Sequence, residues 1–140
     1  MRWAVMAAGL VLQVVGELWD PRWHATHPAQ LERGADLLAA HGIVYAGMLV
    51  LLVGAALGVL ATDARPSWPV LAVLAGSLAE ASGALLDGWR HTQGSESSLG
   101  HLLLYAGLLV AIIGLVAASR SHGGGRRTSS ATVHRERRST

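Results

Sequence analysis

The chain has 140 residues, of which 51% are hydrophobic, and its formal net charge is +2. It contains no cysteine, which excludes disulfides, thiolate metal sites and cysteine nucleophiles. Six of the eleven arginines lie in the last 21 residues, so the positive charge is concentrated at the C-terminal end and nucleic-acid binding is not expected.

Four apolar segments follow one another along the chain, at about residues 3–19, 37–61, 69–86 and 99–119. Each approaches or exceeds the ~20 residues that an α-helix needs to cross a bilayer core. The first segment lacks a large basic region before it and a small-residue cleavage site after it. We therefore expect it to be a retained span rather than a signal peptide.

This pattern predicts an all-α fold, a four-helix transmembrane bundle in a lipid bilayer. The expected parts are a first transmembrane helix pair at residues 1–61, a cytoplasmic turn at 62–68, a second transmembrane helix pair at 69–119 and a disordered basic cytoplasmic tail at 120–140. Disorder is predicted for the tail because Gly, Ser, Thr and Arg dominate it and leave too little apolar surface to fold.

The placement of arginine predicts the orientation in the membrane. Arg2 precedes the first segment and the tail is strongly basic, so both termini are expected to be cytoplasmic. Phe and Lys are absent while Ala, Gly and Val are abundant, which is typical of a GC-rich bacterial genome. We expect a multi-pass protein of the bacterial plasma membrane that forms a homo-oligomer or binds a membrane partner subunit.

The two halves of the chain resemble each other. HGIVYAGMLVLLVG begins at His41, HLLLYAGLLVAIIG begins at His101, and both follow H-x-x-x-Y-A-G-x-L-V-x-x-x-G. Upstream, D-x-x-x-H begins at Asp20 in one half and at Asp87 in the other. We interpret the chain as two tandem two-helix repeats. Each repeat crosses the bilayer twice, so a parallel pseudo-twofold axis along the membrane normal is expected to relate them.

Polar residues form a stripe on the first helix of each half. In the first half, offsets of 0, 4, 7 and 11 place four residues on one helical face: Gln13, Glu17, Asp20 and His24. In the second half the same offsets are occupied by Glu80, Ala84, Asp87 and His91. Polar groups at membrane depth are costly and usually point into the bundle. The two stripes are therefore expected to face each other.

Each half thus offers one carboxylate and two imidazoles, a composition typical of metal ligands. Asp and His four positions apart on a helix can converge on one ion, and a third ligand can come from the next helix. The candidate ligands are Asp87, His91 and His101 in the second half, and Asp20, His24 and His41 in the first. The alternative is an Asp–His hydrogen bond with the second His capping a helix. Pro21 predicts a kink or helix end inside the first motif, which favours the second set.

Four further side chains are candidates for supporting roles: Glu80, Glu17, Tyr45 and Tyr105. A carboxyl group in the bundle is expected to orient a ligand, to relay protons or to bind a bridging ion. The alternative for Glu80 is a protonated carboxyl group that bonds to Ser77 or Gln13. The two tyrosines are expected either to donate hydrogen bonds to the site or to pack between helices.

The D-x-x-x-H motif followed by a histidine on the next helix resembles the copper ligands in the C subunit of the particulate methane and ammonia monooxygenase family. The resemblance is confined to these short motifs. It implies that Asp87, His91 and His101 are copper ligands, and by duplication Asp20, His24 and His41 as well. Copper is therefore favoured over zinc or iron.

These observations predict an integral membrane protein that binds a transition metal, copper above others, at one or two Asp/His/His sites on the extracytoplasmic side. The expected role is metal handling or delivery. One alternative is a metal-dependent membrane oxidoreductase. Another is a structural membrane subunit in which the polar stripes form a helix–helix interface.

Overall fold

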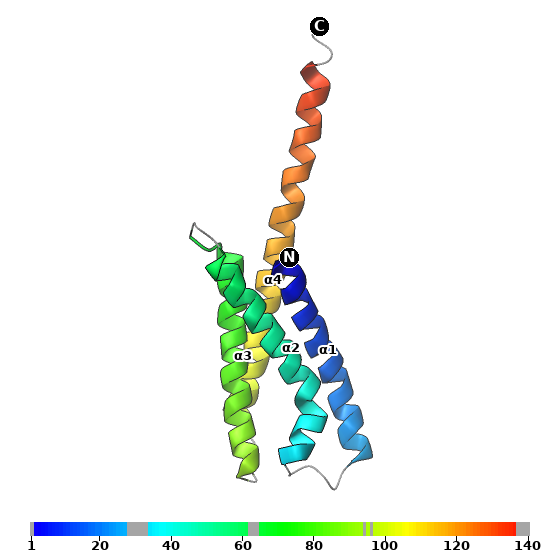
Figure 1. Cartoon of the computed structure of the whole chain (residues 1–140), viewed down its shortest axis with the longest axis vertical. Helices are drawn as coiled ribbons and strands as arrows, with labels where there is room; N and C mark the ends of the chain where they lie inside the picture. The colour runs from blue at the N-terminus through cyan, green and yellow to red at the C-terminus, as the bar shows by residue number, and fades with distance from the viewer. Residues whose placement is uncertain (1, 28–33, 62–64, 94, 96, 137–140) are drawn as a thin grey trace.

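The computed structural model describes residues 2–27, 34–61, 65–93, 95 and 97–136, with the backbone alone for 34–37 and 121–136. Four helices account for nearly all of these residues: α1 (Arg2–Thr26), α2 (Gly34–Leu60), α3 (Trp68–Thr92) and α4 (Ser98–Glu136). Successive helices run in opposite directions (Figure 1). The last turns of α1 and α3 therefore lie at the same end of the molecule as the first turns of α2 and α4.

All four helices are long and apolar enough to cross a membrane, over Arg2–Thr26, Leu38–Leu60, Trp68–Thr92 and Ser98–Arg120. Large apolar side chains on every helix point outward, among them Leu18, Leu57, Leu85 and Leu102. Such a surface is unfavourable in water and favourable against lipid chains, while helical hydrogen bonding satisfies the backbone inside the bilayer. The predicted all-α, four-helix transmembrane architecture is confirmed.

Two pairs of helices make the most extensive contacts, α1 with α2 and α3 with α4. In the first pair the backbones meet at Gly9 and Gly47. A Cβ added at Gly9 would lie 2.8 Å from the carbonyl oxygen of Gly47, and one added at Gly47 would lie 2.6 Å from the backbone nitrogen of Gln13. Because these neighbours are backbone atoms, a side chain at either position would force the helices apart.

The second pair repeats this contact at Gly76 and Gly107. A Cβ added at Gly76 would lie 2.5 Å from the carbonyl oxygen of Gly107, and one added at Gly107 would lie 2.7 Å from the backbone nitrogen of Glu80. Gly76 and Glu80 occupy the positions of Gly9 and Gln13 in the proposed repeat, and Gly107 occupies that of Gly47. The internal duplication and its symmetry axis remain predictions.

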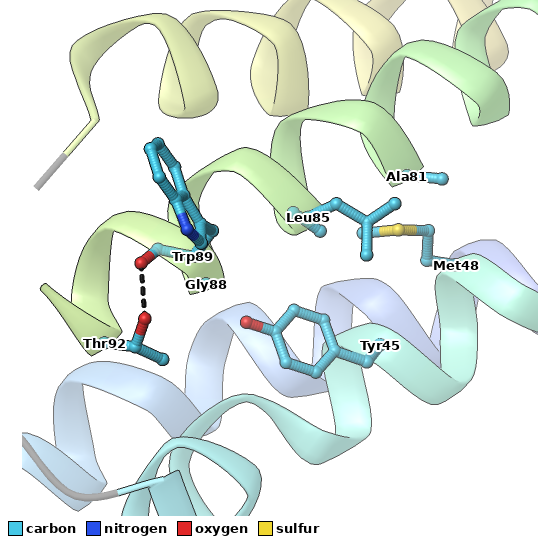
Figure 2. A pocket seen from close by; sticks show the side chains of 8 residues that line it. Tyr45, Met48, Ala81, Leu85, Gly88, Trp89 and Thr92 are labelled. Carbon is cyan, nitrogen blue, oxygen red and sulfur yellow. Dashed lines mark hydrogen bonds between the residues drawn. The ribbon is translucent and has the colours of Figure 1, made fainter.

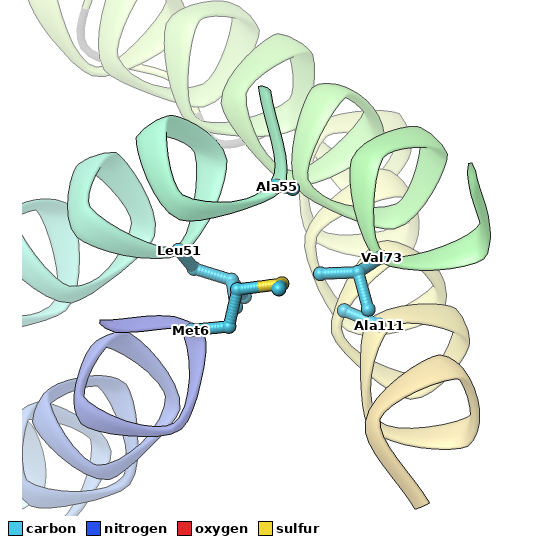
Figure 3. Close-up of a cluster of buried hydrophobic side chains, with 5 residues drawn as sticks. All are labelled: Met6, Leu51, Ala55, Val73 and Ala111. Carbon is cyan, nitrogen blue, oxygen red and sulfur yellow. The ribbon is translucent and has the colours of Figure 1, made fainter. Parts of the chain in front are cut away.

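All four helices contribute to a small apolar core (Figure 3). Its fully buried members are Met6, Leu51, Ala55, Val73 and Ala111. Two of the five are alanines, which fits helices that approach closely, because packing between small residues is the main source of helix association in lipid. The core joins the two helix pairs in the half of the bundle that contains the N-terminus.

Two helices continue past the ends of the apolar segments. Pro21 lies inside α1, which continues to Thr26. Proline removes one backbone donor, but the last turn is held by other contacts, since Trp23 is buried and the ring of His27 stacks on it at 4.6 Å. Helix α4 continues to Glu136, although disorder is predicted from residue 120. A helix that is already formed extends without a new nucleation step.

The glycine contacts generate a testable difference between two substitutions in α2. Gly47→Ala is expected to lower the free energy of unfolding by about 1–3 kcal/mol, because its methyl group overlaps backbone atoms of α1. Gly42→Ala is the matched control, since a Cβ there meets nothing within 4 Å, and alanine favours the helix by up to about 1 kcal/mol. Far-UV circular dichroism during unfolding in mixed micelles of increasing SDS content measures both variants. Equal stabilities would contradict the close contact.

Candidate metal centre

The first Asp/His/His set converges at one end of the bundle. Asp20 and His24 lie one turn apart on α1, and His41 lies opposite them on α2. Asp20 Oδ1 is 3.0 Å from His24 Nε2 and 3.1 Å from His41 Nδ1. One ligand atom from each residue lies within 4.8 Å of the other two. The helix contact at Gly16, where an added Cβ would lie 2.6 Å from the backbone nitrogen of Val44, keeps the two helices close near this set.

The geometry of the set could hold a metal ion. Asp20 Oδ1 and His24 Nδ1 are buried and have no hydrogen-bond partner among the residues that the structure describes. Asp20 Oδ1 nonetheless lies at ion-pair distance from both imidazoles. Ligand atoms about 2.0–2.2 Å from a tetrahedral ion lie roughly 3.4 Å apart, close to these two contacts.

The second set is also brought together, but less closely. Asp87 and His91 lie one turn apart on α3, and His101 is on α4. Asp87 Oδ2 is 3.8 Å from His91 Nδ1 and 3.5 Å from His101 Nε2. The sequence favours this set over the first because of Pro21, whereas the structure gives the shorter contacts to the first set. The helix does not break at the proline, so His24 stays in register with Asp20.

Ser97 holds the carboxylate of Asp87, a role that sequence reasoning did not assign. The backbone N–H of Ser97 donates to Asp87 Oδ1 at 3.3 Å, and the hydroxyl of Ser97 accepts the N–H of Gly100 at 3.0 Å. A serine just before a helical segment is a typical N-cap. That signal was present in the sequence, but it does not reveal that the capping residue also contacts Asp87.

The supporting candidates divide into two groups. Glu17, Tyr45 and Tyr105 line the same small polar cavity as Asp20 and Asp87. Within that group Glu17 and Tyr45 are half-buried, and Tyr105 is largely exposed. The remaining candidate, Glu80, is not in this cavity.

Glu80 instead links the two polar stripes deeper in the bundle. Its carboxylate oxygen Oε2 accepts a hydrogen bond of 3.0 Å from Gln13 Nε2, and both residues are buried. Ser77, the other predicted partner, donates to the carbonyl oxygen of Val73. The bond joins α1 to α3, so the stripes face each other at this level, as their common periodicity predicts.

An apolar pocket of about 480 Å³ lies beside the polar cavity, between α2 and α3. Figure 2 shows Tyr45 and Met48 of α2 facing Leu85 and Trp89 of α3. Tyr45 lines both the apolar pocket and the polar cavity. Tyr45 is therefore the residue through which the apolar pocket adjoins the candidate ligands.

Comparison with known proteins adds no family assignment: no protein family, no curated protein and no solved structure matches the chain. The functional argument therefore rests on the residues and the geometry described above.

The bond between Gln13 and Glu80 predicts unequal effects of two substitutions. Glu80→Ala removes the acceptor and leaves the buried amide of Gln13 unpaired, so the free energy of unfolding is expected to fall by about 1–3 kcal/mol. Glu80→Gln keeps an acceptor oxygen of the same shape and is expected to retain most of the stability. Unfolding in SDS, followed by circular dichroism, compares them. Equal losses would show that the bond is not the source of stability.

Proposed function

We propose that this integral membrane protein binds a transition-metal ion through Asp20, His24 and His41, for metal handling or delivery. The observation that carries the proposal is the convergence of three ligand atoms within 4.8 Å at one end of a membrane bundle. The buried oxygen Oδ1 of Asp20 supports it, because this atom makes no hydrogen bond among the described residues and lies beside both imidazoles. Burial of polar groups in such a bundle costs free energy unless the groups are paired or bind an ion.

Copper is the proposed ion. Imidazole and carboxylate ligands suit Cu, Zn, Fe and Ni, and among divalent first-row ions copper binds such ligands most tightly. The resemblance of the D-x-x-x-H…H motif to the copper ligands of the methane and ammonia monooxygenase C subunit supports the same choice. Three protein ligands leave a coordination position open. An open position is typical of sites that transfer an ion or carry out a reaction, whereas structural sites are closed.

A metal-dependent membrane oxidoreductase is the second candidate function. Tyr45, Tyr105 and Glu17 line the cavity that also contains Asp20. Phenol and carboxyl groups beside an open metal position are able to donate or accept protons during a reaction. An enzyme would lose turnover in a ligand variant that still folds, whereas a delivery protein would lose transfer of the ion to an acceptor.

The proposed setting is the bacterial plasma membrane, with both termini in the cytoplasm and the metal site on the extracytoplasmic side. The basic C-terminal tail and Arg2 support this orientation. The candidate ligands lie at the end of the bundle opposite to the N-terminus (Figure 1). An ion bound there would exchange with the outer aqueous phase rather than with the cytoplasm.

Metal content tests the proposal directly. The chain purified in mild detergent and incubated with Cu²⁺ is expected to retain the ion after desalting, whereas the Asp20→Ala/His24→Ala variant is expected to bind it more than about 100-fold less tightly. Loss of a partner that only orients a ligand already weakens binding by about 10–100-fold. Mass spectrometry measures the metal and circular dichroism checks the fold.

His122→Ala is the matched control for that experiment. His122 lies in α4 beyond its membrane-spanning part, Ser98–Arg120, and belongs to neither Asp/His/His set. It is expected to leave metal content unchanged. Absence of metal from the native chain would identify the Asp–His contacts as a helix–helix interface instead.

The pH dependence distinguishes a metal site from an ion pair. A histidine binds a metal only as the neutral imidazole, so protons compete with the ion, and Cu²⁺ affinity is expected to fall more than about tenfold between pH 7.5 and 5.5. The stabilisation of the fold by Cu²⁺ should decrease accordingly. In the Asp–His alternative the chain binds no ion, so Cu²⁺ should leave its stability unchanged at either pH value. Thermal unfolding with and without Cu²⁺ at the two pH values separates these cases.

A further inference from the structure

One polar cavity lies between the two Asp/His/His sets, and every helix contributes to it. It has a volume of about 70 Å³, several times the space that one water molecule requires. One carboxylate and one imidazole of each set line it: Asp20 with His41, and Asp87 with His101. The two sets therefore open into a shared space rather than into separate pockets.

The lining of this cavity is rich in groups that bind cations. It includes the carboxyl groups of Glu17, Asp20 and Asp87, the imidazoles of His41 and His101, and no arginine. Carboxylate oxygens and imidazole nitrogens are common ligands of divalent transition-metal ions. The cavity therefore offers donor atoms for more than one ion.

We propose that the two sets form one dinuclear centre, in which two divalent transition-metal ions share the cavity. This inference rests on the metal-binding function proposed above. Asp20, His24 and His41 hold one ion, and Asp87, His91 and His101 hold the other. In each set the carboxylate of the aspartate lies between 3.0 and 3.8 Å from both imidazoles.

Each ion would keep at least one coordination position open, because three protein ligands are one fewer than a four-coordinate ion takes. Asp20 and Asp87 both line the cavity, so this space adjoins both ligand sets. A water molecule that loses a proton to the solvent would supply a hydroxide ligand there. Two metal ions about 3.5–4 Å apart would activate such an oxygen ligand. Tyr45 and Tyr105 also line this cavity.

Titration of the full chain with Cu²⁺ in detergent, followed by electron paramagnetic resonance, tests the dinuclear centre. Two ions per chain are expected, with a signal much weaker than two isolated Cu²⁺ ions give, because spins on neighbouring ions couple. Two ions with the full, uncoupled signal would overturn the shared centre. One ion per chain would also overturn it while leaving the mononuclear function in place. No bound ion would overturn both.

A substitution in the second set provides the matched test. His101→Ala is preferred to Asp87→Ala because Asp87 also accepts a hydrogen bond from Ser97, whereas the side chain of His101 is 41% exposed and truncation disturbs packing little. The variant is expected to keep one ion per chain, to lose at least tenfold in affinity for the second, and to show the full signal of one isolated Cu²⁺. His122→Ala should behave like the native chain. An unchanged coupled signal in His101→Ala would overturn the assignment of the second set.

Discussion

The close approach of backbones at Gly9 and Gly47, and at Gly76 and Gly107, is the contact on which the rest of the structure depends. Helices in lipid gain little from burying apolar side chains, because the lipid is as apolar as the core. Close packing between small residues stabilises the association of the helices instead. At this distance a carboxylate on α1 reaches an imidazole on α2, as Asp20 does with His41.

The partners of the buried polar groups differ with their depth in the bundle. Asp20 and Asp87 lie near helix ends and combine with histidines around a polar cavity. Glu80 is deeper, almost wholly inaccessible, and its oxygen Oε2 accepts the amide of Gln13. An unpaired carboxylate in a bundle surrounded by lipid costs several kcal/mol. The polar stripe therefore functions as a structural link in the middle of the bundle and as a candidate binding site at its end.

The sequence predicts the number and approximate bounds of the membrane helices, because length and apolarity over about 20 residues are local properties. It also identifies the six candidate ligands, since a D-x-x-x-H spacing places two side chains on one helical face whatever surrounds the helix. It does not predict that α1 continues past Pro21. Stacking of His27 on the buried Trp23 stabilises that last turn, and such a contact is visible only in the folded chain.

By itself, then, the sequence determined a four-helix membrane protein and which residues carry its polar chemistry, because helical periodicity and hydropathy are properties of neighbouring residues. Only the tertiary structure decided how these residues combine. It makes the first Asp/His/His set the more compact one, assigns Gln13 to Glu80, and opens both sets into one cavity. These outcomes depend on the distances and angles between helices, which the hydropathy and periodicity of single segments do not determine.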